Sequence, residues 1–254
     1  MVRELAPIVC LTVDVEDWYE GMEVLGHPIP RPDDARNGLE ALQGLLEGLD
    51  VTVTLFTIGN YAATVRNELA VLAAGGHEIA SHGPDHGRLP NEAKALGEWL
   101  CRGRETLEDL VQRPVRGFRS PRFDIPPAVG LARYRGLLVE AGFDYVSDTS
   151  CLGPTSPISE LPVLHGGHRL PVGGGSYQRF LPSTLVRSSI EHSTGPAVCY
   201  YHSYDFGATL PALRSARSLA VAKQLLGRSR IKAKFAEILN TYGSEACQHV
   251  ASAV

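Results

Sequence analysis

Short apolar runs alternate along the chain with longer segments in which apolar residues recur every three or four positions. Residues 8–15 form the first apolar run, and 37–49 form the first helical pattern, with leucines on one face. The first is typical of a buried strand and the second of an amphipathic helix. The same patterns predict further strands at 51–56, 79–80, 115–118, 143–146 and 197–201, and further helices at 69–72, 91–112, 127–141 and 211–240.

Strand and helix patterns that alternate at this spacing indicate repeated βα units around a parallel sheet. We therefore expect an α/β fold, a distorted (β/α) barrel that is closed or nearly closed. Residues 151–183 break the alternation because they are rich in glycine and proline, and they predict an irregular insertion over the mouth of the barrel. A chain of 254 residues suits one such barrel. We expect a single domain over residues 1–254, with 245–254 as a tail.

The composition is that of an ordinary globular protein, with 44% hydrophobic and 20% charged residues. The net charge of −4 provides no general attraction to nucleic acid. No segment approaches the roughly 20 apolar residues of a membrane-spanning helix, and the first apolar run is too short for a signal peptide. The five cysteines are scattered, which is typical of reduced thiols. We expect a cytoplasmic protein with no transmembrane segment and no nucleic-acid partner.

Polar residues follow four of the predicted strands at the point where each strand ends. The four stretches are DVED at 14–17, HGPDH at 82–86, RSPRF at 119–123 and HSYD at 202–205. In a barrel of parallel strands these ends meet on one face. Together they supply imidazoles and a carboxylate for a metal ion, a second carboxylate as base, an arginine to orient it and a histidine as acid. This combination is typical of metal-assisted hydrolysis.

His82 and His86 are the candidate metal ligands in this set. Neutral imidazole suits zinc and other borderline divalent ions. Gly83 and Pro84 lie between the two histidines and oppose a regular helix, so a loop must orient both rings. The spacing is weak evidence when taken alone, and the carboxylates elsewhere in the set strengthen it. His202 taken alone is explained equally well as a histidine of the core.

In this order along the chain, the four stretches resemble the motifs of the polysaccharide deacetylases, carbohydrate esterase family 4. LTVDVEDW at 11–18 resembles the first motif, and the His-xxx-His spacing, FRSPRF and YYHSYDF resemble the others. GGGSYQRFLP at 173–182 and RSRIKAKFAEIL at 228–239 are similar to elements of the exosortase-associated branch. The resemblance covers nearly the whole chain. It implies a barrel of the polysaccharide-deacetylase type and a metal-dependent hydrolase of linear amide C–N bonds.

The activity that the resemblance implies is N-deacetylation of an N-acetylated amino sugar in a glycan, glycolipid or glycosylated metabolite, with release of acetate. Asp14 would be the general base, Arg119 the residue that orients it and His202 the general acid. The backbone N–H of Arg122 would help to bind the oxyanion. The candidate substrate-binding residues are aromatic and lie in or beside these motifs: Trp18, Phe123, Tyr177 and Tyr204.

The resemblance further implies that His82 and His86 hold one divalent metal ion, with Zn²⁺ first and other first-row ions as alternatives. The third ligand is open between two residues. The commonest first motif of the family has two adjacent aspartates, whereas here Asp14 is followed by valine and then by Glu16 and Asp17. Strand alternation places Glu16 on the same face as Asp14, and Asp17 remains if the strand has already ended.

The segment 206–236 contains no acidic residue. Its basic residues are Arg214, Arg217, Lys223, Arg228, Arg230, Lys232 and Lys234. One interpretation is a solvated helix face. The other is a patch that attracts a phosphate-bearing or lipid-linked substrate and holds the protein at the periphery of the inner membrane.

Two other functions remain open at this point. One is a hydrolase of the same fold that acts on a non-sugar amide or ureide, as allantoinase-like relatives do. The other is an inactive carbohydrate-binding relative, against which the complete set of base, acid and metal ligands argues. Acetate release from N-acetylated sugars, compared with turnover of ureides, separates the three possibilities.

Overall fold

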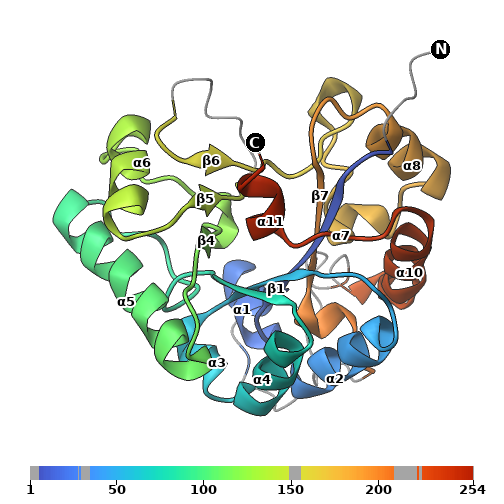
Figure 1. The fold of residues 1–254 in the computed structure, drawn as a ribbon, viewed down its shortest axis with the longest axis horizontal. Coiled ribbons are helices and arrows are strands. Elements are labelled where there is room, and N and C mark those ends of the chain that lie inside the picture. Colours follow the sequence, from blue (N-terminus) through green and yellow to red (C-terminus); the bar gives the residue numbers. More distant parts are fainter. Residues whose placement is uncertain are drawn as a thin grey trace.

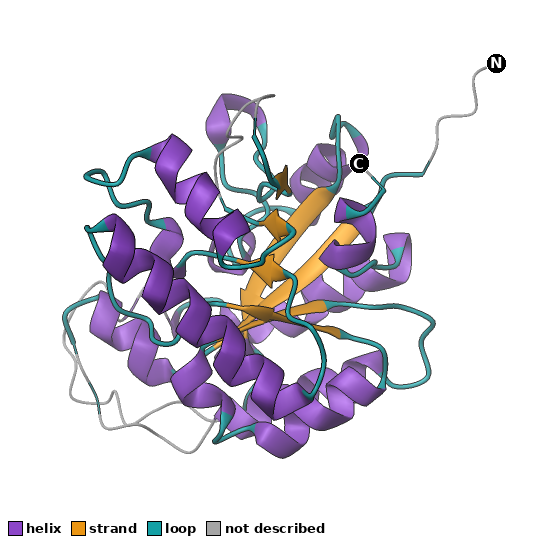
Figure 2. Cartoon of the chain, turned by 60° about the vertical axis from the view of Figure 1, so that its left-hand side comes forward, coloured by secondary structure: helices purple, strands orange, loops and turns teal. Residues whose placement is uncertain are grey.

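The computed structural model describes residues 6–27, 29, 35–148, 156–208, 222 and 225–253. Within them, seven parallel strands form one sheet in the order β6-β5-β4-β3-β2-β1-β7. The sheet curls into a half-barrel, and helices cover its outside (Figures 1 and 2). The prediction of a distorted (β/α) barrel is confirmed.

The two longest strands lie together at one edge of the sheet, and the three shortest lie together at the other edge. The strands are β1 (Val9–Val15), β2 (Thr54–Thr57), β3 (Glu78–Ser81), β4 (Gly117–Phe118), β5 (Tyr145–Val146), β6 (Ser159–Glu160) and β7 (Ala197–His202). Every residue of β1 is buried, as expected of a strand covered on both faces. Leu11 and Val13 belong to the main core, whereas Cys10 belongs to a second cluster with Phe56 and Tyr145.

The helices pack their apolar faces against the sheet and against one another. They are α1 (Trp18–Val24), α2 (Ala35–Leu46), α3 (Gly59–Ala62), α4 (Arg66–Ala74), α5 (Ala93–Val111), α6 (Leu131–Glu140), α7 (Gly175–Gln178), α8 (Ser183–Glu191), α10 (Ile231–Tyr242) and α11 (Cys247–Ala251). Short 3₁₀ turns are η1 (Pro121–Phe123), η2 (Gly167–Arg169), η3 (Ser203–Asp205) and η5 (Arg228–Arg230). In α2, Leu39 and Leu42 are buried as predicted, but the helix ends at Leu46 and leaves Leu49 exposed.

The Gly/Pro-rich insertion predicted at 151–183 is more regular than expected in the part that the structure describes, which begins at residue 156. It contains β6, η2 and α7, and two isolated bridges join it to β7. Gly173 allows this contact, because a Cβ atom there would lie 2.7 Å from the carbonyl oxygen of Val198. The chain after β6 therefore runs back alongside β7, and the two edges of the half-barrel approach each other.

The prediction that residues 245–254 form a tail is wrong. They include α11, whose Cys247 and Val250 are buried against the sheet. The backbone N–H groups of Ala246 and Cys247 donate to the hydroxyls of Thr52 and Thr54, each at 2.8 Å. Hydroxyls at the start of β2 and just before it thus satisfy the first N–H groups of this helix, which hydrophobic patterning could not reveal.

The helix predicted at 211–240 falls partly on residues 209–221 and 223–224, which lie outside the described part of the chain. Its later half corresponds to α10, which begins at Ile231. Among the described helices, none is both long enough and apolar enough to cross a membrane.

Candidate active site

The four polar stretches meet in one open pocket of about 270 Å³ at the C-terminal ends of the strands. Its lining residues are Asp14, Glu16, Gly21, Val24, Leu25, His82, His86, Arg122, Phe123, Tyr200, His202 and Tyr204. The expected convergence of strand ends therefore brings the acids, the histidines and Arg122 to one place. Arg119 does not line the pocket, because its side chain is fully buried beneath it.

The loop between the two histidines depends on glycine. Gly83 has φ of +78°, and a Cβ atom there would lie 2.0 Å from the ring of Trp99 on α5. Conformation and packing therefore both require glycine at this position. As predicted, residues 82–86 form a loop and not a helix.

Glu16, His82 and His86 form a buried group whose ligand atoms all lie within 4.8 Å of one another. The Nδ1 of His82 lies 2.9 Å from the carbonyl oxygen of Arg119. A carbonyl can only accept, so Nδ1 carries the proton and leaves Nε2 available as a ligand atom. Burial lowers the pKa of His82 to about 4, which keeps its imidazole neutral at physiological pH. A neutral imidazole is the form that binds a metal ion.

The residues of this group fit a divalent cation. Glu16 Oε2 lies 2.9 Å from His86 Nε2, but the contact lacks the geometry of a hydrogen bond and the buried oxygen has no hydrogen-bond donor. Burial raises the pKa of Glu16, but His86 and the other nearby histidines lower it by more, to about 2. A buried, ionised oxygen without a donor is costly unless a cation balances it. One carboxylate and two imidazoles are a typical zinc ligand set.

Asp17, the alternative third ligand, has a different place. Its carboxylate accepts a hydrogen bond from the backbone N–H of Trp18 at 2.6 Å, and Glu20 completes a capping box with it. Asp17 therefore caps the N-terminus of α1. The geometry favours Glu16 over Asp17 as the carboxylate ligand.

Asp14 is held in one orientation by Arg119. The Nη1 of Arg119 donates to Asp14 Oδ1 at 2.7 Å and to the hydroxyl of Thr12 at 2.9 Å. The other guanidinium nitrogens donate to the carbonyl oxygen and hydroxyl of Ser147. The Arg119 guanidinium also lies 4.1 Å from the ring centre of Phe56. A charged side chain fixed by this many partners can orient a carboxylate with little freedom left.

His202 lies at the end of β7 and contacts two acids. Its Nδ1 is 3.3 Å from Asp205 Oδ2, and its Nε2 is 3.5 Å from Glu16 Oε1. Burial lowers the pKa of His202, but Asp205 and Glu16 raise it by more, to about 9. The imidazole therefore carries a proton at neutral pH.

Two residues of this arrangement were missed as site residues from the sequence. Asp205 Oδ1 accepts a hydrogen bond from the Nη2 of Arg179 at 2.9 Å, and both side chains are buried. Arg179 therefore fixes the carboxylate of Asp205, which in turn contacts His202. Asp205 lay within the HSYD stretch, but nothing in the sequence connected it with Arg179.

The four aromatic candidates divide into two pairs. Phe123 and Tyr204 line the pocket. Trp18 is buried behind Tyr204, with 4.3 Å between the ring centres, and Tyr177 is 47% exposed and does not line the pocket. Contact of Trp18 and Tyr177 with the substrate stays a prediction.

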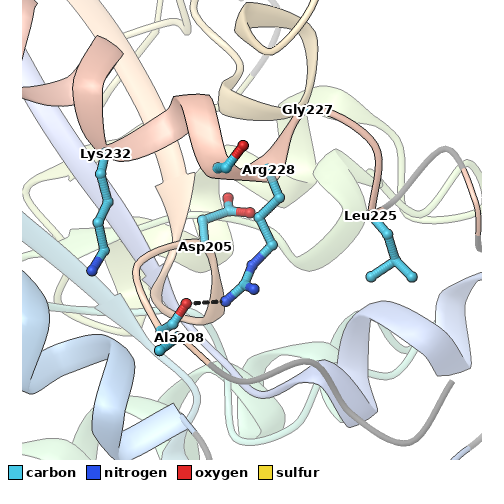
Figure 3. Close-up of a pocket in the computed structure, with 8 residues that line it drawn as sticks. Asp205, Ala208, Leu225, Gly227, Arg228 and Lys232 are labelled. Atoms are coloured by element: carbon cyan, nitrogen blue, oxygen red, sulfur yellow. Dashed lines mark hydrogen bonds between the residues drawn. The ribbon is translucent and has the colours of Figure 1, made fainter.

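In the described part of the basic segment, two of the basic side chains donate hydrogen bonds to backbone carbonyl oxygens. Arg228 donates to the carbonyl oxygens of Tyr204 and Gly207, and Lys234 donates to that of Leu181. Figure 3 shows Arg228 turned toward the loop at Asp205 and Ala208, whereas Lys232 stands separately at the same cavity of about 430 Å³. Arg214, Arg217 and Lys223 lie outside the described residues. The cavity is larger than the pocket above, but it lacks the histidines and Asp14.

Comparison with known proteins agrees with this site. Residues 25–144 match the family model described as polysaccharide deacetylase, and residues 142–252 match a domain of unknown function, DUF3473. The first match includes both histidines of the loop and 119–123, whereas Asp14 and His202 lie outside it. Comparison with curated proteins gave no match. Residues 25–144 are therefore similar to polysaccharide deacetylases.

Solved structures show the same fold. A protein from Mycobacterium smegmatis that is described as a polysaccharide deacetylase is 21% identical, with a TM-score of 0.63 over 98% of this chain and 93% of that one. A family 4 carbohydrate esterase from Streptomyces lividans, solved with acetate, is 15% identical, with a TM-score of 0.51 over 95% and 91%. A family 4 pseudoenzyme from Bacillus anthracis is 11% identical, with a TM-score of 0.52 over 97% and 66%.

Proposed function

We propose that the protein is a metal-dependent N-deacetylase that hydrolyses the acetamide of an N-acetylated amino sugar in a glycan, glycolipid or glycosylated metabolite. One observation carries the proposal. A single pocket holds a three-residue ligand group, a carboxylate oriented by an arginine, and a protonated histidine. Because the fold is shared with a pseudoenzyme, the proposal depends on these side chains and not on the fold.

Glu16, His82 and His86 would hold one divalent ion, and their donor atoms favour zinc among the first-row metals. Such an ion supplies Lewis acidity, which polarises the amide carbonyl and lowers the pKa of a bound water toward about 7.

Asp14 is the proposed general base. Arg119 occupies its Oδ1, whereas its Oδ2 makes no hydrogen bond with any described residue and is available to take a proton from the attacking water. A positioned base of this kind contributes roughly 10²–10⁴-fold to the rate.

The backbone N–H of Arg122 is the proposed donor to the oxyanion that forms at the amide carbon. It makes no hydrogen bond with the rest of the described chain, although Arg122 lies in a tight turn with φ of +60°. A donor fixed before the reaction stabilises developing charge without reorganisation.

His202 is the proposed general acid. The amine of the sugar is a poor leaving group unless it is protonated, and His202 carries a proton at neutral pH. Asp205 contacts Nδ1, so the proton at Nε2 is the one that can pass to the leaving nitrogen. The C–N bond then breaks, and the products are acetate and a free amine.

Acetate release from N-acetylglucosamine conjugates, measured with zinc present and beside allantoin as a ureide, tests the proposal. We expect turnover of the sugar conjugates, and we expect Asp14→Asn to keep its metal but to lose roughly 10²–10⁴-fold in kcat. Turnover of the ureide alone would favour the allantoinase-like alternative. A metal-loaded protein that turns over neither would be an inactive relative.

The same proposal includes one catalytic domain over 1–254. It is supported by β5, which pairs with β4 on one side and β6 on the other and so joins the two matched segments in one sheet. We also propose that the protein belongs to the exosortase-associated branch, which residues 173–182 and 228–239 support. Its proposed location is the cytoplasm, at the periphery of the inner membrane. Fractionation of cells that produce the protein tests the location.

A further inference from the structure

Arg122 is a charged side chain of the pocket wall that has no counter-ion in the described part of the chain. Its Nε is buried and has no hydrogen-bond partner. Arg119, three residues earlier, differs because its guanidinium donates to Asp14, Thr12 and Ser147. A buried donor without an acceptor costs free energy, which a ligand that supplies the acceptor recovers.

The backbone around Arg122 is held in an uncommon shape. Arg122 and Phe123 both have positive φ, at 60° and 53°, which residues other than glycine rarely adopt. The turn is anchored because the Ser120 N–H donates to Asp148 Oδ1 at 2.9 Å and the Ser120 hydroxyl donates to the carbonyl oxygen of Asp124 at 2.5 Å. Such conformations persist only where the surrounding structure fixes them. Here the fixed turn sets Arg122 in the pocket wall.

The charges of the pocket leave Arg122 unbalanced. Asp14 is paired with Arg119, and Asp205 is paired with Arg179. Glu16 belongs to the metal-ligand group, and the two positive charges of a divalent ion there would outweigh its single negative charge. Arg122 lines the same pocket as His86 and Asp14. Its positive charge therefore lies beside the reacting centre.

We propose that Arg122 gives the active site a preference for N-acetylated sugars that carry an anionic group, a carboxylate or a phosphate, close to the acetamide. The inference rests on the proposed deacetylase function and names the substrate class of that site. A guanidinium suits both groups because its planar N–H donors can bind two oxygens at once. Arg122 is a specificity residue in this account, in addition to the proposed role of its backbone N–H.

Three probes test the preference: the methyl glycoside of N-acetylglucosamine, its 3-phosphate and its 3-O-carboxymethyl ether, because position 3 is next to the carbon that carries the acetamide. The kcat/KM of each anionic probe divided by that of the neutral probe is the quantity compared. We expect this ratio to be above about tenfold in the native protein and to fall by about tenfold or more in Arg122→Gln, because hydrogen bonds to charged groups are strong. The two anionic probes show whether carboxylate or phosphate is preferred.

Two variants serve as controls. Arg122→Lys keeps the charge but not the planar donors, so part of the ratio should return. Arg102→Gln removes one positive charge from an exposed position on α5, outside the pocket, and should leave the ratio as it is. A fall in the Arg102 variant as large as in Arg122→Gln would assign the effect to net charge and overturn the proposal.

Direct binding separates this inference from the proposed function. In the Asp14→Asn background, calorimetric titration of the same probes should show tighter binding of the anionic probes, and Arg122→Gln should remove the difference. Two results would overturn the role of Arg122 and leave the deacetylase intact. One is acetate release from all three probes with kcat/KM ratios near one in the native protein. The other is an equal loss of kcat/KM on all three probes in Arg122→Gln. No turnover but selective anion binding would overturn the deacetylase and keep the role of Arg122 as an anion-binding residue.

Discussion

Replacing Asp148 with asparagine is expected to stabilise the protein at neutral pH and to change its stability little near pH 4. Asp148 is 3% exposed and lies just after β5. Its Oδ1 accepts a hydrogen bond from the N–H of Ser120 at 2.9 Å, and its Oδ2 accepts one from the hydroxyl of Tyr134 at 3.1 Å. Burial raises the pKa of this carboxyl from 3.8 to about 6, although these bonds and Arg119 oppose the rise.

The size of the effect follows from the difference in pKa between the folded and unfolded states. One pKa unit corresponds to about 1.4 kcal/mol, so the rise from 3.8 to about 6 corresponds to about 3 kcal/mol. The folded state holds this proton more tightly than the unfolded state. The contribution of Asp148 to stability is therefore complete below about pH 4, is lost as pH rises to about 6, and stays lost above that value.

Asparagine should keep both contacts without the charge. Its Oδ1 can accept from Ser120, and its amide N–H can donate to the hydroxyl of Tyr134. Urea unfolding of Asp148→Asn and the native protein at several pH values gives the difference in their free energies of unfolding. We expect this difference to grow in favour of the variant by about 3 kcal/mol between pH 4 and pH 7.

The difference between the two proteins isolates Asp148 from the other groups that titrate in the same range. Asp144→Asn is the matched control, because Asp144 is 56% exposed and pairs with Arg116 at the surface, where such pairs contribute about 0–1 kcal/mol. A difference for Asp148→Asn that stays constant from pH 4 to pH 7 would refute the reasoning, since it would mean that folding does not perturb this carboxyl.

Three further outcomes are expected. Glu16→Gln should lose most of the bound divalent metal, as measured by elemental analysis, whereas Asp17→Ala should keep the metal and lose about 0.5–2 kcal/mol of stability with the cap of α1. Equal metal loss in both variants would reject Glu16 as the particular ligand. Asp205→Asn should move the alkaline limb of the kcat/KM profile to lower pH, because Asp205 is the largest cause that raises the pKa of His202; an unmoved limb would assign the acid to another residue. Arg228→Met should lower the free energy of unfolding by about 1–3 kcal/mol, because two carbonyl oxygens lose their donor, whereas Lys232→Gln should change it little; similar losses in urea unfolding would contradict the distinction.

The convergence of the site could be predicted because it depends on two regular features of the sequence. Alternation along β1 places Asp14 and Glu16 on the same side, although the strand itself ends at Val15. Parallel strands bring their C-terminal ends to one edge, which is why the histidine loop and the stretch after β4 meet there. Strand boundaries were less well predicted: β4 and β5 each have two residues, whereas strands of four residues were expected at 115–118 and 143–146.

Burial of the aromatic residues could not be predicted in the same way. Trp18 and Tyr204 both lie within motif stretches and pack in one small apolar cluster, but Tyr204 also lines the pocket and Trp18 does not. Residues 245–254 carried no strong pattern, yet hydroxyls of the strand region bind the N–H groups of α11. In both cases the position depends on a neighbour that is distant in the chain.

The sequence by itself determined the α/β class, the order of the polar stretches and the glycine that the histidine loop requires, because each depends on local periodicity or local conformation. Only the tertiary structure decided which side chains share a partner. Arg179 and Asp205 are 26 residues apart, and Arg119 lies 105 residues from Asp14. Arg122 has a pocket on one side and no counter-ion within the described residues. The two ion pairs, and the absence of a counter-ion for Arg122 among the described residues, follow from the order of the strands and from which loops that order places side by side. Local sequence patterns do not encode this order.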